Sequence, residues 1–185
     1  PYTTLFRSTL MLIASSHTIN PALYSGLKYD IVKDFAPIAL TLKVPFFLVT
    51  HPSFPASNVK EVIAHWKANP GKVNFASAGT GTPGHFAAEL LKLRSRAALT
   101  HVPYKGAGPA LNDLLGGHVD LYFSGFPAAM PHVKAGKLKA IAVSGPRRIS
   151  ALPQMPTFTE AGLGNFEPTI WFGVIGPAGL PRPLV

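Results

Sequence analysis

The chain has no cysteine, few acidic residues and no long apolar run. Without cysteine among its 185 residues it forms neither disulfides nor thiolate metal sites, and its redox compartment stays open. Only 8 Asp and Glu stand against 17 Lys and Arg, so a general acid–base pair is hard to nominate. No apolar run approaches the roughly 18 residues that are needed to cross a bilayer.

The formal charge of +9 predicts an acidic partner. Nucleic acid is one candidate, but the Lys and Arg residues are scattered singly, without a basic stripe interleaved with aromatics. Attraction of small anions towards a cleft fits that scatter better. A hydrophobic content of 47% and a charged content of 14% predict a packed globular protein of one domain or two small lobes.

Strand-like and helix-like segments alternate along the chain, which predicts an α/β fold with a mostly parallel, helix-covered sheet. The clearest helix is 58–67, where Asn58 and Glu61 form a capping box and Val59, Val62, Ile63 and Trp66 form an apolar stripe. The other predicted helices are 20–24, 109–115 and 128–134, and the predicted strands are 10–14, 38–42, 46–49, 98–102, 119–123, 138–143 and 171–175.

Residues 73–90 form the segment around which the chain is organised. A short strand with Val73 and Phe75 turns through SAGTGTPG and enters a helix whose expected apolar side is Phe86, Leu90 and Leu93. Glycines allow close approach of a ligand to the main chain, and the unpaired N–H groups at a helix start favour an anion. Together with the nearby hydroxyls and imidazole of Ser77, Thr80, Thr82 and His85, they predict an anion cradle.

An alternative interpretation comes from the same letters, because Gly79, Gly81 and Gly84 spell the dinucleotide fingerprint G-x-G-x-x-G. That fingerprint needs an acidic residue after the next strand to hold the ribose, and none occurs before Asp113. Pro83 is also awkward in a loop that should lie flat against a pyrophosphate. A nucleotide-dependent enzyme therefore stays as an alternative only.

Polar turns follow four predicted strands, at 15–18, 77–85, 102–106 and 124–126. Ligands of open α/β sheets bind beyond the carboxyl ends of the strands, so these turns are expected to converge. Each hydroxyl taken singly is also explained as an ordinary helix cap or turn residue.

The seven histidines form neither H-x-x-x-H nor H-E-x-x-H, so we expect no metal site. His17 and His85 differ from the others because each follows a polar turn on the expected ligand edge. No G-x-S-x-G elbow is present, so we nominate no catalytic residue and no cofactor. The site is predicted to hold a ligand and not to transform it.

Several segments, in this order, resemble one known family: DFAPIAL, VNFASAGTGTPGHFAAELL, HVPYKGAGPALNDLLGGHVDL, KAGKLKAIAVSG and WFGVIGPAG. The chain is similar to the substrate-binding receptors of tripartite tricarboxylate transporters, the Bug family, from about Leu10 onwards. The resemblance implies a two-lobed periplasmic-binding-protein fold (Venus flytrap, type II) that closes on a small organic acid in the periplasm. It implies delivery of this acid to membrane transporter subunits, with no nucleic acid partner and a monomeric receptor.

The resemblance also implies site residues. The second-lobe ligand loop would be 77–85, with Gly79, Gly81, Thr82 and His85 as contacts, and Ser77 belongs to the same candidate site. Ser16 and His17 resemble the Thr-His pair of the first lobe, and Tyr104 would line the cleft. Ser124-Gly125 stands where many members have Asp-Asn. Because Ser124 offers no acid to a ligand ammonium, we expect a di- or tricarboxylate in preference to an amino acid.

The expected lobes are 1–44 with 147–185 and, between them, 45–146, with crossings near 44–46 and 145–148. Residues 1–8 have no readable period and are set aside as a candidate cloning or assembly scar. The first lobe is expected to be incomplete, because the chain starts inside a strand and ends where a helix would begin. Besides the nucleotide-dependent enzyme, the effector-sensing domain of a transcription regulator and a ligandless interaction protein remain as alternatives.

Overall fold

The computed structural model describes residues 9–164 and 166–181, and the chain divides into two compact units. Unit 1 comprises Pro1–Val44 and Ile170–Val185, and unit 2 comprises Pro45–Thr169. The chain leaves unit 1 inside strand β2 (Phe35–Thr50) and returns inside strand β7 (Thr169–Pro177). The candidate scar at 1–8 lies outside the described residues.

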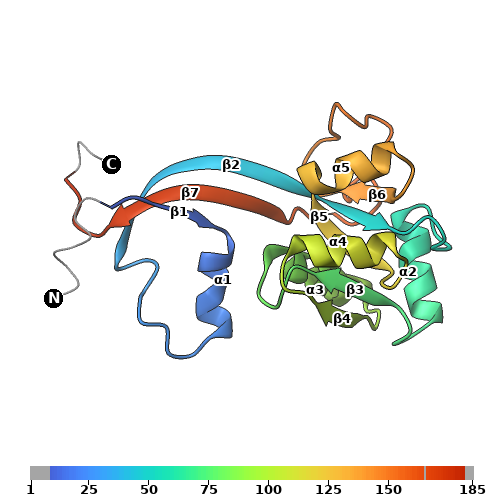
Figure 1. Ribbon diagram of the computed structural model, residues 1–185, viewed down its shortest axis with the longest axis horizontal. Helices are drawn as coiled ribbons and strands as arrows, with labels where there is room; N and C mark the ends of the chain where they lie inside the picture. The colour runs from blue at the N-terminus through green and yellow to red at the C-terminus, as the bar shows by residue number, and fades with distance from the viewer. Residues whose placement is uncertain (1–8, 165, 182–185) are drawn as a thin grey trace. The chain divides into compact units, whose positions relative to one another are not determined.

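Unit 1 is built on three strands and one helix. Strand β1 (Met11–Ala14) pairs antiparallel with β7, and both strands are labelled in Figure 1. The first part of β2 is tied to β7 by the Thr41 hydroxyl, which donates to the Phe172 carbonyl oxygen at 3.0 Å. Helix α1 (Ser16–Leu23) follows β1 directly. The prediction of a buried strand at 10–14 is wrong for most of its length: Leu10 and Leu12 are 60% and 64% exposed, and only Ile13 is buried. Side chains alternate between the faces of a strand, and both of these leucines lie on the uncovered one.

The sheet of unit 2 has five strands in the order β6-β2-β5-β3-β4. The strands β5 (Leu121–Gly125), β3 (Asn74–Ser77) and β4 (Thr100–Pro103) are parallel to one another, as predicted. The second part of β2 runs antiparallel to both of its neighbours, β5 and β6 (Lys139–Val143), so the sheet is mixed and not mostly parallel.

Helices cover both faces of this sheet. On one face α4 (Ala107–Leu115) and α5 (Phe126–Lys134) bury a cluster that includes Leu114 and Met130 against Phe47, Ala76 and Tyr122. On the other face α3 (Pro83–Ser95) starts against β5, where a Cβ added to Gly84 would lie 3.0 Å from the Phe123 carbonyl oxygen. This close approach requires glycine and brings the N-terminus of α3 to the carboxyl end of the sheet.

Helix α2 (Val59–Ala68) confirms the capping box. The Asn58 side chain accepts from the Glu61 main-chain N–H at 3.0 Å, and Glu61 reaches back to the Ser57 N–H at 2.8 Å. The stripe buries Val59 and Trp66 against unit 2, each with 1% exposure. None of the described helices is long and apolar enough to cross a membrane.

Three local predictions are corrected by packing. The strands expected at 38–42 and 46–49 are one strand, β2, which continues through Pro45. Helix α1 begins at Ser16 and not at 20, so the predicted polar turn is the first turn of a helix. Helix α3 buries Gly84, Ala87, Ala88 and Leu91, whereas Leu93 of the expected stripe is 75% exposed. Small side chains allow α3 to approach the sheet closely. The gain from this close packing outweighs the gain from burying the larger apolar side chains on the other side of the helix.

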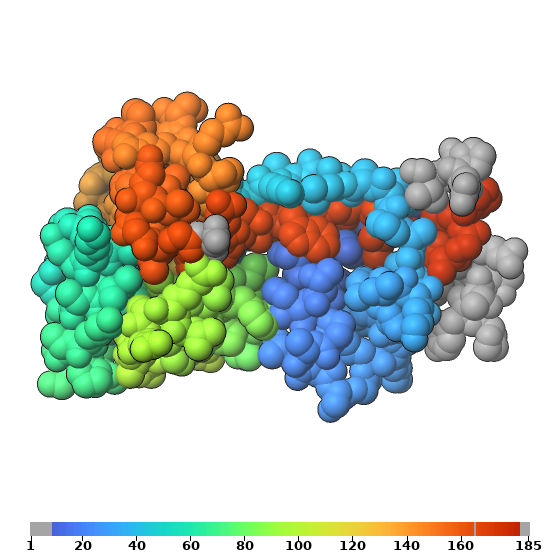
Figure 2. Space-filling view, turned by 180° about the vertical axis from the view of Figure 1, so that it is seen from behind, coloured from blue at the N-terminus to red at the C-terminus, as the bar shows by residue number. Residues whose placement is uncertain are grey.

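The segment 147–169 packs in unit 2, which differs from its predicted place in the first lobe. Val143 of β6 donates its N–H to the Pro156 carbonyl oxygen at 3.0 Å and accepts from the Phe158 N–H at 3.2 Å. The Phe158 ring lies 4.6 Å from Phe166 and 6.0 Å from Phe123, measured between ring centroids. Figure 2 shows this segment, in orange, against the other parts of unit 2. The second crossing therefore lies at Thr169–Ile170, and the first at Val44–Pro45, within the stretch expected for it.

Candidate functional site

Three of the four predicted polar turns meet at the carboxyl end of the unit 2 sheet. In the register of β3 and β4, Ser77 pairs with Pro103. Beyond the strands, the Tyr104 N–H donates to the Ser77 carbonyl oxygen, and the Gly106 N–H donates to the Ala78 carbonyl oxygen, each at 3.0 Å. The turn after β5 begins at the parallel neighbour of β3. The fourth turn, 15–18, belongs to unit 1.

The loop between β3 and α3 uses several of its own amides to hold its shape. Gly79 and Gly81 have φ angles of +140° and +81°, in the region that favours glycine. The Gly79 N–H donates to the Ser77 hydroxyl at 3.1 Å, the Gly81 N–H to His85 Nδ1 at 3.3 Å, and the Thr82 N–H to the Gly79 carbonyl oxygen at 3.2 Å. The Thr82 hydroxyl also donates to Gly79 O, at 2.7 Å. The predicted contacts Gly79, Gly81 and Thr82 therefore shape the loop and do not present free amides.

Other amides of the loop and of the first turn of α3 take no part in this bonding. Within the described part of the chain, the N–H groups of Thr80, Gly84 and His85 have no hydrogen-bond acceptor. Gly84 and His85 are the second and third residues of α3, where the helix leaves its N–H groups unpaired and its dipole favours negative charge. The site can thus offer N–H donors and a positive end of a dipole to an anion.

Two stacked histidine rings lie beneath the loop. His85 and His101 have ring centroids 4.0 Å apart with planes inclined by 20°, and Phe75 stacks on His101 at 4.8 Å. Burial, aided by His85, lowers the pKa of His101 from 6.5 to about 4. Burial also lowers the pKa of His85. Because Nδ1 of neutral His85 accepts from Gly81, its proton lies on Nε2, which can donate to a ligand.

Two predicted hydroxyl contacts are buried. Ser77 and Ser124 both have 0% exposure. The Ser77 hydroxyl bonds to Gly79 and His101, and the Ser124 hydroxyl donates to the Gly125 carbonyl oxygen at 3.2 Å. Neither hydroxyl is presented at a surface, so their part in the site is structural.

The Tyr104 hydroxyl is also engaged, since it donates to Asp113 on α4 at 2.6 Å. Burial and this carboxylate raise the pKa of Tyr104 to about 12, and the same hydrogen bond lowers the pKa of Asp113. Tyr104 thus anchors the turn after β4 to α4, and its ring remains half-buried at the predicted position.

Unit 1 carries Ser16 and His17 on the first turn of α1. His17 Nδ1 lies 3.2 Å from the Ala14 carbonyl oxygen, so the neutral ring carries its proton there and leaves Nε2 as an acceptor. The preceding residue, Ser15, is 5% exposed, and its hydroxyl has no partner among the described residues. Ser15 was not singled out from the sequence, although its position before a helix is a recognised signal.

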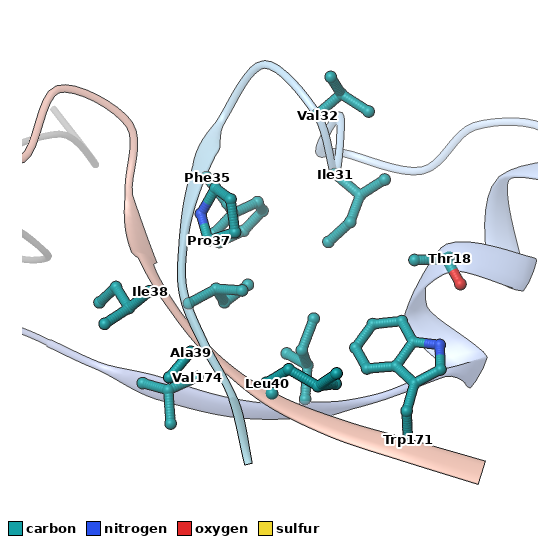
Figure 3. Close-up of a pocket in the computed structure, with 13 residues that line it drawn as sticks. Thr18, Ile31, Val32, Phe35, Pro37, Ile38, Ala39, Leu40, Trp171 and Val174 are labelled. Atoms are coloured by element: carbon teal, nitrogen blue, oxygen red, sulfur yellow. The ribbon is translucent and has the colours of Figure 1, made fainter. Parts of the chain in front are cut away.

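A cavity of about 420 Å³ in unit 1 has a different character (Figure 3). It is lined by apolar side chains of β1, β2 and β7 and of the 31–32 turn, and Thr18 is the only hydroxyl-bearing residue of its lining. The Thr18 hydroxyl already donates to the Ser15 carbonyl oxygen at 2.8 Å. No charged side chain and none of the predicted site residues lines the cavity, so its chemistry does not suit a carboxylate.

His101 is the residue that sequence reasoning missed. It lies on β4 opposite Phe75 of β3, and only the parallel register of these strands brings it under the loop. No group of three His, Asp or Glu side chains within 9–164 and 166–181 could hold a metal ion.

Comparison with known proteins decides the family. Residues 7–185 match the sequence model of the tripartite tricarboxylate transporter family receptor. The chain belongs to this receptor family. It is 37% identical to the protein BugT of Bordetella pertussis over 179 residues, which cover 96% of this chain and 55% of BugT.

Solved structures agree with this membership of the receptor family. MatC from Rhodopseudomonas palustris, solved with bound malate, has a TM-score of 0.84 and 32% identity, covering 95% of this chain and 60% of MatC. A second R. palustris protein, solved with adipate, has a TM-score of 0.86 and 32% identity, covering 95% and 59%. The predicted resemblance and the α/β periplasmic-binding-protein fold are thereby confirmed. The chain spans about half the length of the curated relatives it matches.

Proposed function

We propose that this receptor-family chain binds a small organic acid through its carboxylate groups and does not transform it. The observation that carries the proposal is that three N–H groups, of Thr80 in the loop and of Gly84 and His85 at the start of α3, have no acceptor among the described residues. Main-chain donors at a helix N-terminus suit a carboxylate, and charge-assisted hydrogen bonds are the stronger class. Malate and adipate, which two solved relatives hold, are both dicarboxylates.

The proposed biological role follows from the family. The whole protein would act in the periplasm as a monomeric receptor. It would deliver the acid to the membrane subunits of a tripartite tricarboxylate transporter. In unit 1, Ser16 and His17 are proposed as a second group of ligand donors. His17 would face the ligand with Nε2, because its Nδ1 already faces Ala14 O.

A dicarboxylate without an ammonium group is the proposed ligand class. Ser124, at the position where an acid would hold an ammonium, is buried and bonded locally. Glu89, one turn along α3 from His85, is paired with Lys92 at 3.0 Å. Neither residue offers a free carboxylate to a cationic ligand.

Isothermal titration calorimetry of the purified chain tests this proposal. We expect malate, succinate or adipate to bind, and aspartate, glutamate, NAD and ATP to bind at least tenfold more weakly or not at all. Binding of aspartate or glutamate well above the dicarboxylates would contradict the proposed ligand class. Binding of NAD or ATP alone would favour the nucleotide interpretation instead.

His85→Phe is expected to weaken dicarboxylate binding by roughly ten- to a hundredfold, because a charge-assisted hydrogen bond contributes about 1.5–3 kcal/mol. Phenylalanine retains an aromatic ring to stack on His101 but removes both ring nitrogens. His132→Phe, on α5 and away from the loop, is the control and should leave the affinity within about twofold. An unchanged affinity in the His85 variant would remove this side chain from the proposed site.

A further inference from the structure

Ser77 connects the ligand loop to a residue outside it. Its buried hydroxyl accepts from the Gly79 N–H and donates to the Gly79 carbonyl oxygen, both at 3.1 Å, and lies 2.6 Å from His101 Nε2. A hydroxyl has one proton. With that proton given to Gly79 O, His101 Nε2 has to be the donor to the Ser77 oxygen.

His101 reaches the loop a second time through its ring. The ring is held between Phe75, at 4.8 Å and 16°, and His85, at 4.0 Å and 20°. His85 in turn accepts from the Gly81 N–H at 3.3 Å. His101 on β4 is therefore linked to both glycines of the loop that have positive φ angles. The link to Gly79 runs through Ser77, and the link to Gly81 runs through His85.

We propose that His101 is a positioning residue for carboxylate binding. It holds the Gly79–Gly81 main chain in the shape that turns the Thr80 N–H outward and sets His85 with its Nε2 proton free, while making no contact with the ligand itself. The inference deepens the proposed function and rests on it for the final step, from loop shape to affinity. Its first step, from His101 to the loop, concerns the ligand-free protein alone.

Two variants separate the hydrogen bond from the ring packing. His101→Gln keeps an N–H donor at about the reach of Nε2 but gives up the aromatic ring. His101→Phe keeps a ring that can stack on Phe75 and His85 but has no donor for Ser77. Ser77→Ala removes the same hydrogen bond from the other side and leaves both histidine rings in place.

Amide hydrogen exchange, followed by NMR without ligand, tests the first step. In His101→Phe and in Ser77→Ala we expect the Gly79 N–H to exchange about fivefold faster, because a hydrogen bond contributes about 1 kcal/mol. Exchange in β3 and α4 should stay unchanged, and His101→Gln should keep the Gly79 rate within about twofold. Equal acceleration across all of unit 2, or equal Gly79 rates in the Phe and Gln variants, would overturn the proposal. If the Phe variant does not fold, the comparison of Ser77→Ala with His101→Gln decides.

Calorimetry with malate tests the second step on the same proteins. We expect His101→Phe to bind about tenfold more weakly than the wild type and His101→Gln to stay within about twofold, a rescue that a merely structural role would not produce. Wild-type affinity in a His101→Phe protein whose Gly79 exchange is accelerated would overturn the positioning role in binding. If the wild type binds no dicarboxylate, the proposed function fails, and the exchange rates still decide whether His101 shapes the loop.

Discussion

Phe158→Ala is expected to lower the free energy of unfolding of unit 2 by about 3–5 kcal/mol, as for other large-to-small changes in cores. Phe158 is fully buried and packs between Phe123 of β5 and Phe166. Urea unfolding in a Trp171→Phe background, followed by the fluorescence of Trp66, which is 1% exposed in α2, measures the effect on this unit.

Leu93→Ala is the matched control for this change. Leu93 lies on α3 of the same unit but is 75% exposed, so its loss should cost less than about 0.5 kcal/mol. Phe158→Leu, which keeps most of the volume, serves if the alanine variant does not fold and should cost under about 1.5 kcal/mol. A loss below about 1 kcal/mol for Phe158→Ala would contradict the assignment of 147–169 to unit 2.

Acid is expected to destabilise unit 2 well above the pH at which carboxylates titrate. The pKa of His101 is about 4 in the folded protein and near 6.5 when unfolded, so between these values the unfolded chain binds more protons. The stability that unit 2 has while His101 is neutral is therefore complete above pH 6.5. It falls as the pH is lowered and is lost below about pH 4. Full conversion of the shift would give about 3.4 kcal/mol, which we reduce to about 1–2 kcal/mol because the half-buried ring is screened by solvent.

Urea midpoints between pH 4.5 and 7.5 measure this dependence. His85, whose pKa burial also lowers, adds to the loss in the same direction. His101→Phe, which cannot take up a proton, should flatten most of the slope, whereas His132→Phe should not. An equally steep slope in His101→Phe would show that other groups cause the acid sensitivity.

The elements of this fold that depend on local chemistry could be predicted. The Asn58 cap, the stripe on α2 and the strand–turn–helix at 73–90 all depend on neighbours within a few residues, so the sequence displays them. The convergence of the turns after β3, β4 and β5 also follows, because parallel strands end at one edge.

The use of the site residues could not be predicted, because it depends on contacts between distant segments. The Ser77 and His85 side chains decide which loop amides stay free. The Ser77 hydroxyl in turn bonds to His101, which lies 24 residues away in the sequence. The place of 147–169 is decided by Phe158 meeting Phe123 of β5. Hydrophobic periodicity predicted that the larger apolar side chains of α3 face the sheet. The close contact at Gly84 instead places the small side chains of α3 against the sheet.

The way the two units share the chain has a consequence for folding. Unit 2 is one uninterrupted stretch, while β7 of unit 1 meets β1 only across the whole length of unit 2. Closing so long an unstructured loop costs chain entropy, and a folded unit 2 holds the two ends of that loop before β7 has to find β1. During synthesis, the β1–β7 pairing waits until β7 has left the ribosome, so unit 2 can be native while β1 is still unpaired.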